Sequence, residues 1–214
     1  MPRITAAEFA AQKKTTHDSE RDTPRVKQLR REYETRSADW APSRRIYLDE
    51  TGTHLGLTRG YGRAAPGQRV VEGTPDYSGP HYTLVAALGW QGIQAPLLFE
   101  GPMTGPIFEQ YVLDCLVPTL ERGDIVIMDN LSAHKRSAIE AAIEARGARL
   151  EYLPPYSSDF NPIELAWAKV KSVLRTLKAR LYDDLVDAIC SGLQAITAAD
   201  AQAWFAHCHN AAHS

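Results

Sequence analysis

Short apolar runs alternate with longer amphipathic stretches along most of the chain. Ile125–Met128 is a β-branched run entered from Gly123, which is typical of a strand buried on both faces. Four further strands are predicted, at residues 44–52, Tyr82–Leu88, Ile93–Phe99 and Leu150–Leu153. The two in the middle form a hairpin turned at Trp90-Gln91-Gly92, and Pro96 favours an edge position for its second strand.

Amphipathic spacing predicts helices between and after these strands. They cover Pro24–Arg36, residues 106–120, a segment capped by Ser132 and closed by Gly147, a long helix that begins at Pro162, and residues 183–196. The long helix carries a continuous apolar stripe of Ile163, Trp167, Val170, Leu174, Leu177 and Leu181. A second row lies about 100° further round the helix and contains Glu164, Ala168, Lys171, Arg175 and Lys178.

This order of strands and helices predicts an α/β fold. Residues 44–214 form the predicted domain, and residues 53–80 are rich enough in glycine and proline to predict loops and short strands. Residues 1–43 are predicted to be a basic, partly helical arm or linker. Their helix has only a thin apolar stripe of Val26, Leu29 and Tyr33, which could not bury a core alone.

Composition and charge narrow the class of protein. With 214 residues, 44% of them hydrophobic, the chain suits one globular domain with a small appendage. No apolar run approaches the ~20 residues of a membrane span, and three scattered cysteines favour a reduced, cytoplasmic protein. The net charge of −2 argues against nucleic-acid binding by bulk charge. The cations are local, however, with five between residues 162 and 181 against Glu164 alone.

Two acids occupy positions suited to chemistry. Asp129 directly follows the buried strand, at the carboxyl end where open α/β sheets place ligands. Glu164 stands beside the apolar stripe at the head of the row of cations, which suits an acid that meets a polyanion and its metals. A single aspartate after a strand is more often a helix cap or a solvated turn, so Asp129 alone carries little weight.

The two segments MDN-x-x-x-H and LPPYSSDFNPIELAW together resemble the catalytic core of insertion-sequence DDE transposases related to the Tc/mariner superfamily. The resemblance implies a ribonuclease-H-like fold, a mixed sheet whose first three strands are antiparallel, with helices on both faces. It also implies a first acid at the end of an early strand, which Asp49 supplies. The second and third acids differ by 164 − 129 = 35 positions, as the Asp-Asp-Glu members require.

The same resemblance implies roles for particular residues. Asp49, Asp129 and Glu164 would be catalytic and would hold two Mg²⁺ or Mn²⁺ ions, Asp49 and Asp129 sharing one and Glu164 helping to hold the other. Asn130, His134 and Asn161 would support the ligands or contact DNA, although His134 could equally be a half-exposed histidine in a first helical turn. Contacts to the DNA backbone would come from Lys135, Lys171, Arg175 and Lys178.

The implied function is that of a transposase catalytic domain, which cleaves DNA at the terminal inverted repeats of its element and transfers the strands into target DNA. Its implied partners are DNA, a second copy of the chain in the DNA complex, and a helix-turn-helix module supplied upstream. We expect a bacterial cytoplasmic protein that associates with the nucleoid when it binds DNA. Two alternatives stay open: a domesticated nuclease of the same fold, and a catalytically silent DNA-binding or assembly partner.

Overall fold

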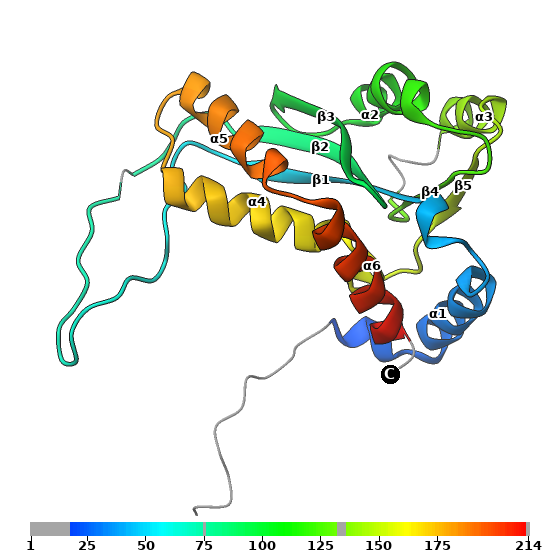
Figure 1. The fold of residues 1–214 in the computed structure, drawn as a ribbon, viewed down its shortest axis with the longest axis horizontal. Helices are drawn as coiled ribbons and strands as arrows, with labels where there is room; N and C mark the ends of the chain where they lie inside the picture. The colour runs from blue at the N-terminus through cyan, green and yellow to red at the C-terminus, as the bar shows by residue number, and fades with distance from the viewer. Residues whose placement is uncertain (1–17, 75, 132–135, 213–214) are drawn as a thin grey trace, which may run out of the picture.

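A mixed five-stranded sheet forms the centre of the molecule in a computed structural model that describes residues 18–74, 76–131 and 136–212 (Figure 1). The strands are β1 (Arg45–Thr53), β2 (Tyr82–Gly89), β3 (Gly92–Glu100), β4 (Ile125–Met128) and β5 (Arg149–Tyr152), in the spatial order β3-β2-β1-β4-β5. β1, β2 and β3 are antiparallel neighbours, whereas β4 runs parallel to β1 and β5 runs parallel to β4. The predicted α/β class and the antiparallel first three strands are therefore confirmed.

The hairpin of β2 and β3 follows the sequence prediction closely. Gly89 pairs with Gly92 across a two-residue turn, and Gly92 has a φ of +122° that only glycine adopts easily. All eight residues of β2 are buried, because this strand lies between β1 and β3. β3 is an edge strand, as Pro96 predicts, since an edge tolerates a residue that lacks a backbone N–H.

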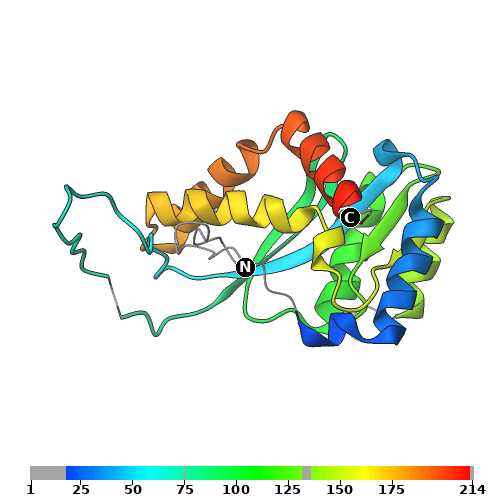
Figure 2. The same cartoon turned by 90° about the horizontal axis from the view of Figure 1, so that it is seen from below.

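Helices cover both faces of the sheet (Figure 2). α2 (Gly105–Tyr111) and α3 (Ser137–Ala145) bury Phe108, Ile139 and Ile143 against one face. The other face carries α4 (Ile163–Leu177), α5 (Tyr182–Gln194) and α6 (Ala198–Ala212), and α1 (Pro24–Ser37) packs at its edge. Each face thus has its own apolar core, and the strands must present side chains to both.

Strand pleating assigns the two faces residue by residue. In β1, Ile46 and Leu48 enter the core beneath α2 and α3, whereas Tyr47 enters the core beneath α4. In β4, Val126 and Met128 face α2 and α3, whereas Ile127 faces α4. Because successive side chains point to opposite faces, the next odd-numbered residues, Asp49 and Asp129, turn toward the α4 side.

Two predicted helices, those after Ser132 and over residues 106–120, differ in detail from the structure. The helix predicted from Ser132 appears as α3, which begins at Ser137; Ser132 lies outside the described residues. The helix predicted over residues 106–120 begins as α2. It continues as a wider π-helical segment at Val112–Leu116 and then as a tighter 3₁₀ turn at Val117–Thr119. Such irregular turns leave no mark in a hydrophobic pattern.

The predicted apolar stripe of α4 is too long. The helix ends at Leu177, because Lys178 adopts a left-handed backbone conformation with φ of 54°. Leu177 and Leu181 are consequently 53% and 68% exposed, so the stripe ends at Leu174. Lys178 stands beyond the end of the helix and not in the row of cations along it.

Residues 54–81 join β1 to β2 and project from the body of the molecule (Figure 1). The predicted short strands are wrong here, since residues 54–74 and 76–81 contain no helix or strand. Tyr61 and Val71 are 95% and 90% exposed on this loop. Among the described residues, no helix is both long enough and apolar enough to cross a membrane.

Candidate active site

Asp49 lies on β1, and Asp129 follows the last residue of the neighbouring strand β4 at the same level. Leu48 of β1 pairs with Met128 of β4 in the parallel register, and Asp49 and Asp129 are the next residues along the chain. The resemblance implied that Asp49 ends its strand, but β1 continues beside β2 to Thr53. It stands where the shorter β4 stops, which is the carboxyl edge of the parallel pair.

Glu164 reaches the same place from the other side. It belongs to the first turn of α4, whose buried residues Ile163, Ala166 and Trp167 fix the helix against the sheet. The Glu164 side chain itself is exposed, which is more open than its predicted position beside the core. The helix thus presents the carboxylate to solvent at the rim of the sheet.

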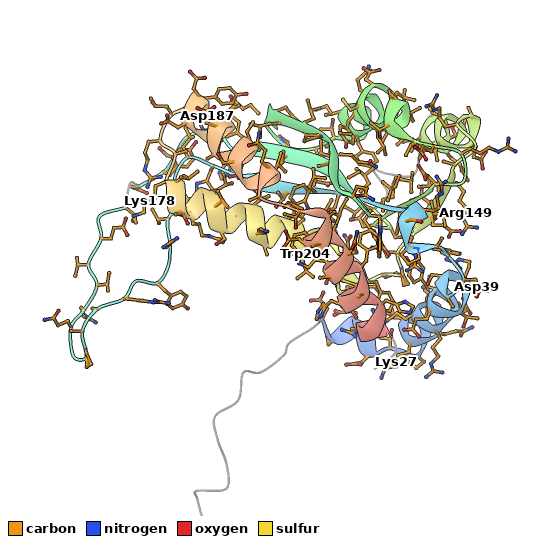
Figure 3. All side chains as sticks on the ribbon, in the orientation of Figure 1. Lys27, Asp39, Arg149, Lys178, Asp187 and Trp204 are labelled. Carbon is orange, nitrogen blue, oxygen red and sulfur yellow. The ribbon has the colours of Figure 1, made fainter. Side chains whose placement is uncertain are left out.

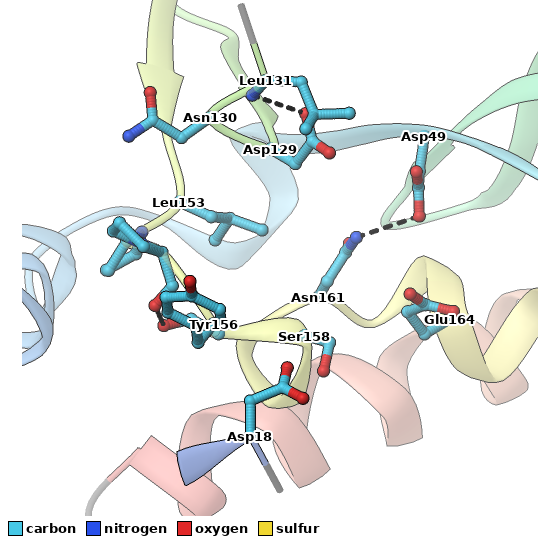
Figure 4. A pocket seen from close by; sticks show the side chains of 13 residues that line it. Asp18, Asp49, Asp129, Asn130, Leu131, Leu153, Tyr156, Ser158, Asn161 and Glu164 are labelled. Carbon is cyan, nitrogen blue, oxygen red and sulfur yellow. Dashed lines mark hydrogen bonds between the residues drawn. The ribbon is translucent and has the colours of Figure 1, made fainter. Parts of the chain in front are cut away.

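A pocket of about 460 Å³ brings the three acids together (Figure 4). Asp49, Asp129 and Glu164 line it with Asn130 and Asn161, and Tyr156 stands at its rim. Figure 4 shows Asn161 reaching from the loop before α4 toward Asp49. Of the ten predicted site residues, the pocket therefore gathers five.

Hydrogen bonds hold the two strand-borne carboxylates in place. Asp49 accepts one from the backbone N–H of Glu50 at 2.8 Å and one from the amide Nδ2 of Asn161 at 3.2 Å. Asp129 accepts one from the backbone N–H of Leu131 at 3.2 Å. Asn161 is only 5% exposed, and its Oδ1 has no hydrogen-bond partner among the described residues.

The electrostatic environment of Asp49 is unfavourable for its charge. Burial, followed by the negative charge of Glu164, raises the pKa of Asp49 to about 7, with smaller contributions from Glu50 and Asp129. The hydrogen bond from Glu50 opposes this rise and is outweighed. A carboxyl held among other acids in a pocket is a common mark of a functional site.

The remaining predicted residues have mixed outcomes. His134 and Lys135 lie outside the described residues. Lys171 and Arg175 are half-buried on α4, and neither forms an ion pair within the described part of the chain. Lys178 forms an ion pair with Glu72 of the projecting loop, at the far end of α4 from Glu164 (Figure 3).

Comparison with known families decides the kinship of the chain. The model of the DDE superfamily endonuclease family matches residues 44–186. The chain belongs to this family. A comparison with curated protein sequences gave no match.

Solved structures confirm the fold of this DDE-family chain. The Mos1 transposase paired-end complex with left transposon end superposes with a TM-score of 0.76 at 17% identity, covering 100% of this chain and 66% of that one. The catalytic domain of Mos1 mariner transposase gives a TM-score of 0.70 at 13% identity, covering 92% and 93%. The predicted ribonuclease-H-like fold and the predicted membership of the DDE superfamily endonuclease family are therefore confirmed.

The pocket of the DDE-family chain has the chemistry of a hard-metal site. Its charged groups are carboxylates, which Mg²⁺ and Mn²⁺ prefer, and their mutual repulsion is the kind that a cation relieves. Within the described ranges, no group of three or more histidine, cysteine, aspartate or glutamate side chains is arranged to hold a metal ion. A Mg²⁺ site needs only one or two carboxylates beside water and phosphate oxygens, so the residues present fit such an ion.

Sequence reasoning missed the support of this site by α1. Arg30 is only 7% exposed and forms an ion pair with Asp159, two residues before Asn161. In the sequence, Arg30 belongs to the charged run Gln-Leu-Arg-Arg-Glu within the predicted basic arm, and no role was predicted for it. The spacing of Val26, Arg30 and Tyr33 places them on one face of the helix and could have indicated the contact.

Proposed function

We propose that this chain is a transposase catalytic domain that cleaves DNA at the ends of its element and joins the freed strands to target DNA. Asp49, Asp129 and Glu164 are its catalytic acids. The observation that carries the proposal is their placement in one pocket: Asp49 on β1, Asp129 at the same level just after the parallel strand β4, and Glu164 on α4. The family match and the Mos1-like fold support it.

Two divalent ions would be held by the three acids, Asp49 and Asp129 sharing one and Glu164 helping to hold the other. Bound Mg²⁺ or Mn²⁺ would supply an activated water and would neutralise the charge that develops on the leaving oxygen. Mos1 paired-end complexes have been determined with Mn and with Mg, which supports this choice of metals. The ions and their number are part of the proposal.

The protein's own residues prepare the site. Asp49 must lose its proton to bind a cation, and because its pKa is raised to about 7, a proton competes with the cation for this carboxylate near neutral pH. The Asn161 amide donates to Asp49 Oδ2 and so fixes the plane of the carboxylate. Asn130 and Glu164 are exposed among the residues that line the pocket, so a DNA phosphate that approaches the acids could contact them.

DNA would lie along the cationic row of α4. Lys171 and Arg175 follow Glu164 along the helix at intervals that keep them near one face, and they would contact backbone phosphates. Lys178 is a weaker candidate than the sequence suggested, because it pairs with Glu72. Asn130 lines the pocket, and Asn130, His134 and Lys135 would contact the DNA strand that enters it.

The chain spans 66% of the length of the Mos1 transposase in its paired-end complex. We propose that a helix-turn-helix module, in the same or another chain, recognises the terminal inverted repeats. Mos1 transposase structures include a paired-end complex and a strand transfer complex, which supports DNA ends and target DNA as the proposed partners. We propose a homodimer on DNA, acting at the nucleoid in the bacterial cytoplasm.

A strand-transfer assay tests this function. The element ends, read from the DNA that flanks the gene, are supplied as pre-cut duplexes with free 3′-hydroxyls, together with a plasmid target and Mg²⁺. We expect plasmid molecules joined to the duplex, and no joined product in EDTA. Cleavage of uncut ends without any joining would favour the nuclease alternative, and DNA binding without either reaction would favour the silent partner.

A further inference from the structure

α1 binds the loop of residues 157–161, which leads into the proposed active site. Arg30 donates from Nη1 to Asp159 Oδ1 at 2.9 Å and from Nη2 to Asp159 Oδ2 at 2.7 Å, the two-pronged geometry that suits guanidinium and carboxylate. Nη1 also donates to the Ser157 hydroxyl at 2.8 Å. Its guanidinium carbon lies 3.9 Å from the centre of the Phe160 ring. One side chain thus contacts three of four consecutive loop residues.

The aromatic residues of α1 extend the same contact. Tyr33, one helical turn after Arg30, stacks on Phe160 with ring centres 5.7 Å apart. Both rings are buried, Tyr33 at 5% and Phe160 at 3% exposure. Arg21 adds a more exposed ion pair to Asp159 at 3.1 Å. The contact between α1 and this loop is therefore buried and made at several points, although the two segments are more than 120 residues apart in the chain.

The same loop lines the pocket of the acids with Ser157, Ser158 and Asn161. The backbone N–H groups of Phe160 and Asn161 donate to Ser157 and Ser158 carbonyls at 3.0 Å, so the loop closes in a 3₁₀ turn. The next side chain is Asn161, which donates to Asp49, and the Asn161 carbonyl accepts the Glu164 N–H at 3.3 Å. Few rotatable bonds separate the Arg30 contact from the Asn161 amide and the first turn of α4.

We infer that Arg30 is a positioning residue for the active site, acting through Asp159 and Ser157 on Asn161 and Glu164. The catalytic meaning of this inference rests on the proposed function. The effect of Arg30 on the position of Asn161 can be tested whether or not that function holds. Arg30 does not line the pocket of the acids, so it acts through the loop and not on substrate. Residues before position 44 would then be part of the catalytic unit.

The side-chain amide of Asn161 reports the positioning without metal or DNA. Its two proton signals, assigned in ¹⁵N-labelled protein by their loss in Asn161→Asp, should shift in Arg30→Ala. Lys27→Ala is the matched control, because Lys27 lies on the same helix and its exposed ion pair is with Asp22 and not with Asp159. Unchanged Asn161 signals in folded Arg30→Ala would overturn the inference.

Metal binding gives the second readout. The Mg²⁺ concentration that gives half of the maximal thermal stabilisation should rise about tenfold in Arg30→Ala and stay constant in Lys27→Ala. Arg30→Lys should not restore it, because one ammonium group cannot span both carboxylate oxygens and the Ser157 hydroxyl. Full restoration by lysine would mean that only charge matters, and would overturn the positioning role.

Two further points keep the test decisive. If Arg30→Ala does not fold, Ser157→Ala removes one of the three Arg30 hydrogen bonds together with the bond from the Ser157 hydroxyl to the Pro155 carbonyl, whereas Arg30→Lys keeps the latter bond. Both variants should shift the Asn161 signals, and unchanged signals in Arg30→Lys would overturn the inference. If the unmodified chain binds no Mg²⁺ and cleaves no DNA, the proposed function fails. The Asn161 signals still decide whether Arg30 positions the loop.

Discussion

Asp49 is the residue whose surroundings say most about the site. It lies on a central strand, faces α4 by the pleat of β1, and shares a pocket with Asp129 and Glu164. Burial and the neighbouring acids raise its pKa to about 7, which is a cost that folding alone does not require. A site that binds cations explains this cost, because a bound metal ion stabilises the ionised carboxylates that repel one another in its absence.

The raised pKa predicts how Asp49→Asn changes stability with pH in EDTA. The unfolded pKa is about 3.9 and the folded value is about 7, so the folded state binds an extra proton between these values. The stability that this proton provides is complete below about pH 4 and is lost as pH rises through 7. The variant should melt several degrees above the parent at pH 8 and show no such gain at pH 4. A gain independent of pH would contradict the assignment.

Glu164→Gln should separate chemistry from folding. The amide keeps the size of the side chain but loses the charge that helps to hold an ion. We expect cleavage to fall by more than about 100-fold, since even residues behind the ligands cost roughly 10–100-fold. Because Glu164 is exposed, melting should change by no more than about 2 °C without metal.

Mg²⁺ provides the internal control for that variant. It should raise the melting temperature of the parent more than that of Glu164→Gln, because a ligand stabilises only the state that binds it. Equal Mg²⁺-dependent cleavage by both proteins would remove Glu164 from the active site and leave the fold unaffected.

At the scale of elements, β1, β4 and α4 were predictable because each buries a regular apolar pattern. Those three elements suffice to bring the acids together, once the parallel pairing of β1 and β4 is known. The end of α4 was not predictable, because Lys178 adopts its left-handed conformation without glycine or asparagine to signal it. The contact of Arg30 with the loop of residues 157–161 was missed, because a buried arginine in a charged helix looks the same in the sequence as a solvated one.

The row of cations on α4 makes a prediction at the same scale. Lys171→Ala and Arg175→Ala should each weaken DNA binding about equally across sequences and lower the slope of log affinity against log salt by about 1. Lys178→Ala should have a smaller effect, because Glu72 already neutralises that charge. Sequence-dependent losses, or a larger loss from Lys178, would contradict this placement of the DNA.

At the scale of the whole molecule, the boundary between residues 43 and 44 stays a prediction. α1 and the segment after it bury Tyr33 and Trp40 in the core beneath α4. A chain of residues 44–214 should therefore melt at least about 6 °C below the full chain, from about 3 kcal/mol for one buried aromatic ring at roughly 2 °C per kcal/mol. Equal melting temperatures would establish residues 1–43 as a dispensable arm.

Anomalous diffraction from crystals of the full chain soaked in Mn²⁺ tests the central claim most directly. The account predicts an anomalous peak in the pocket within coordinating distance of both Asp49 and Asp129, with a second peak near Glu164 when DNA ends are bound. Asp129→Asn crystals should lose or weaken the first peak. A well-occupied Mn²⁺ elsewhere in the molecule, with none in this pocket, would contradict the account.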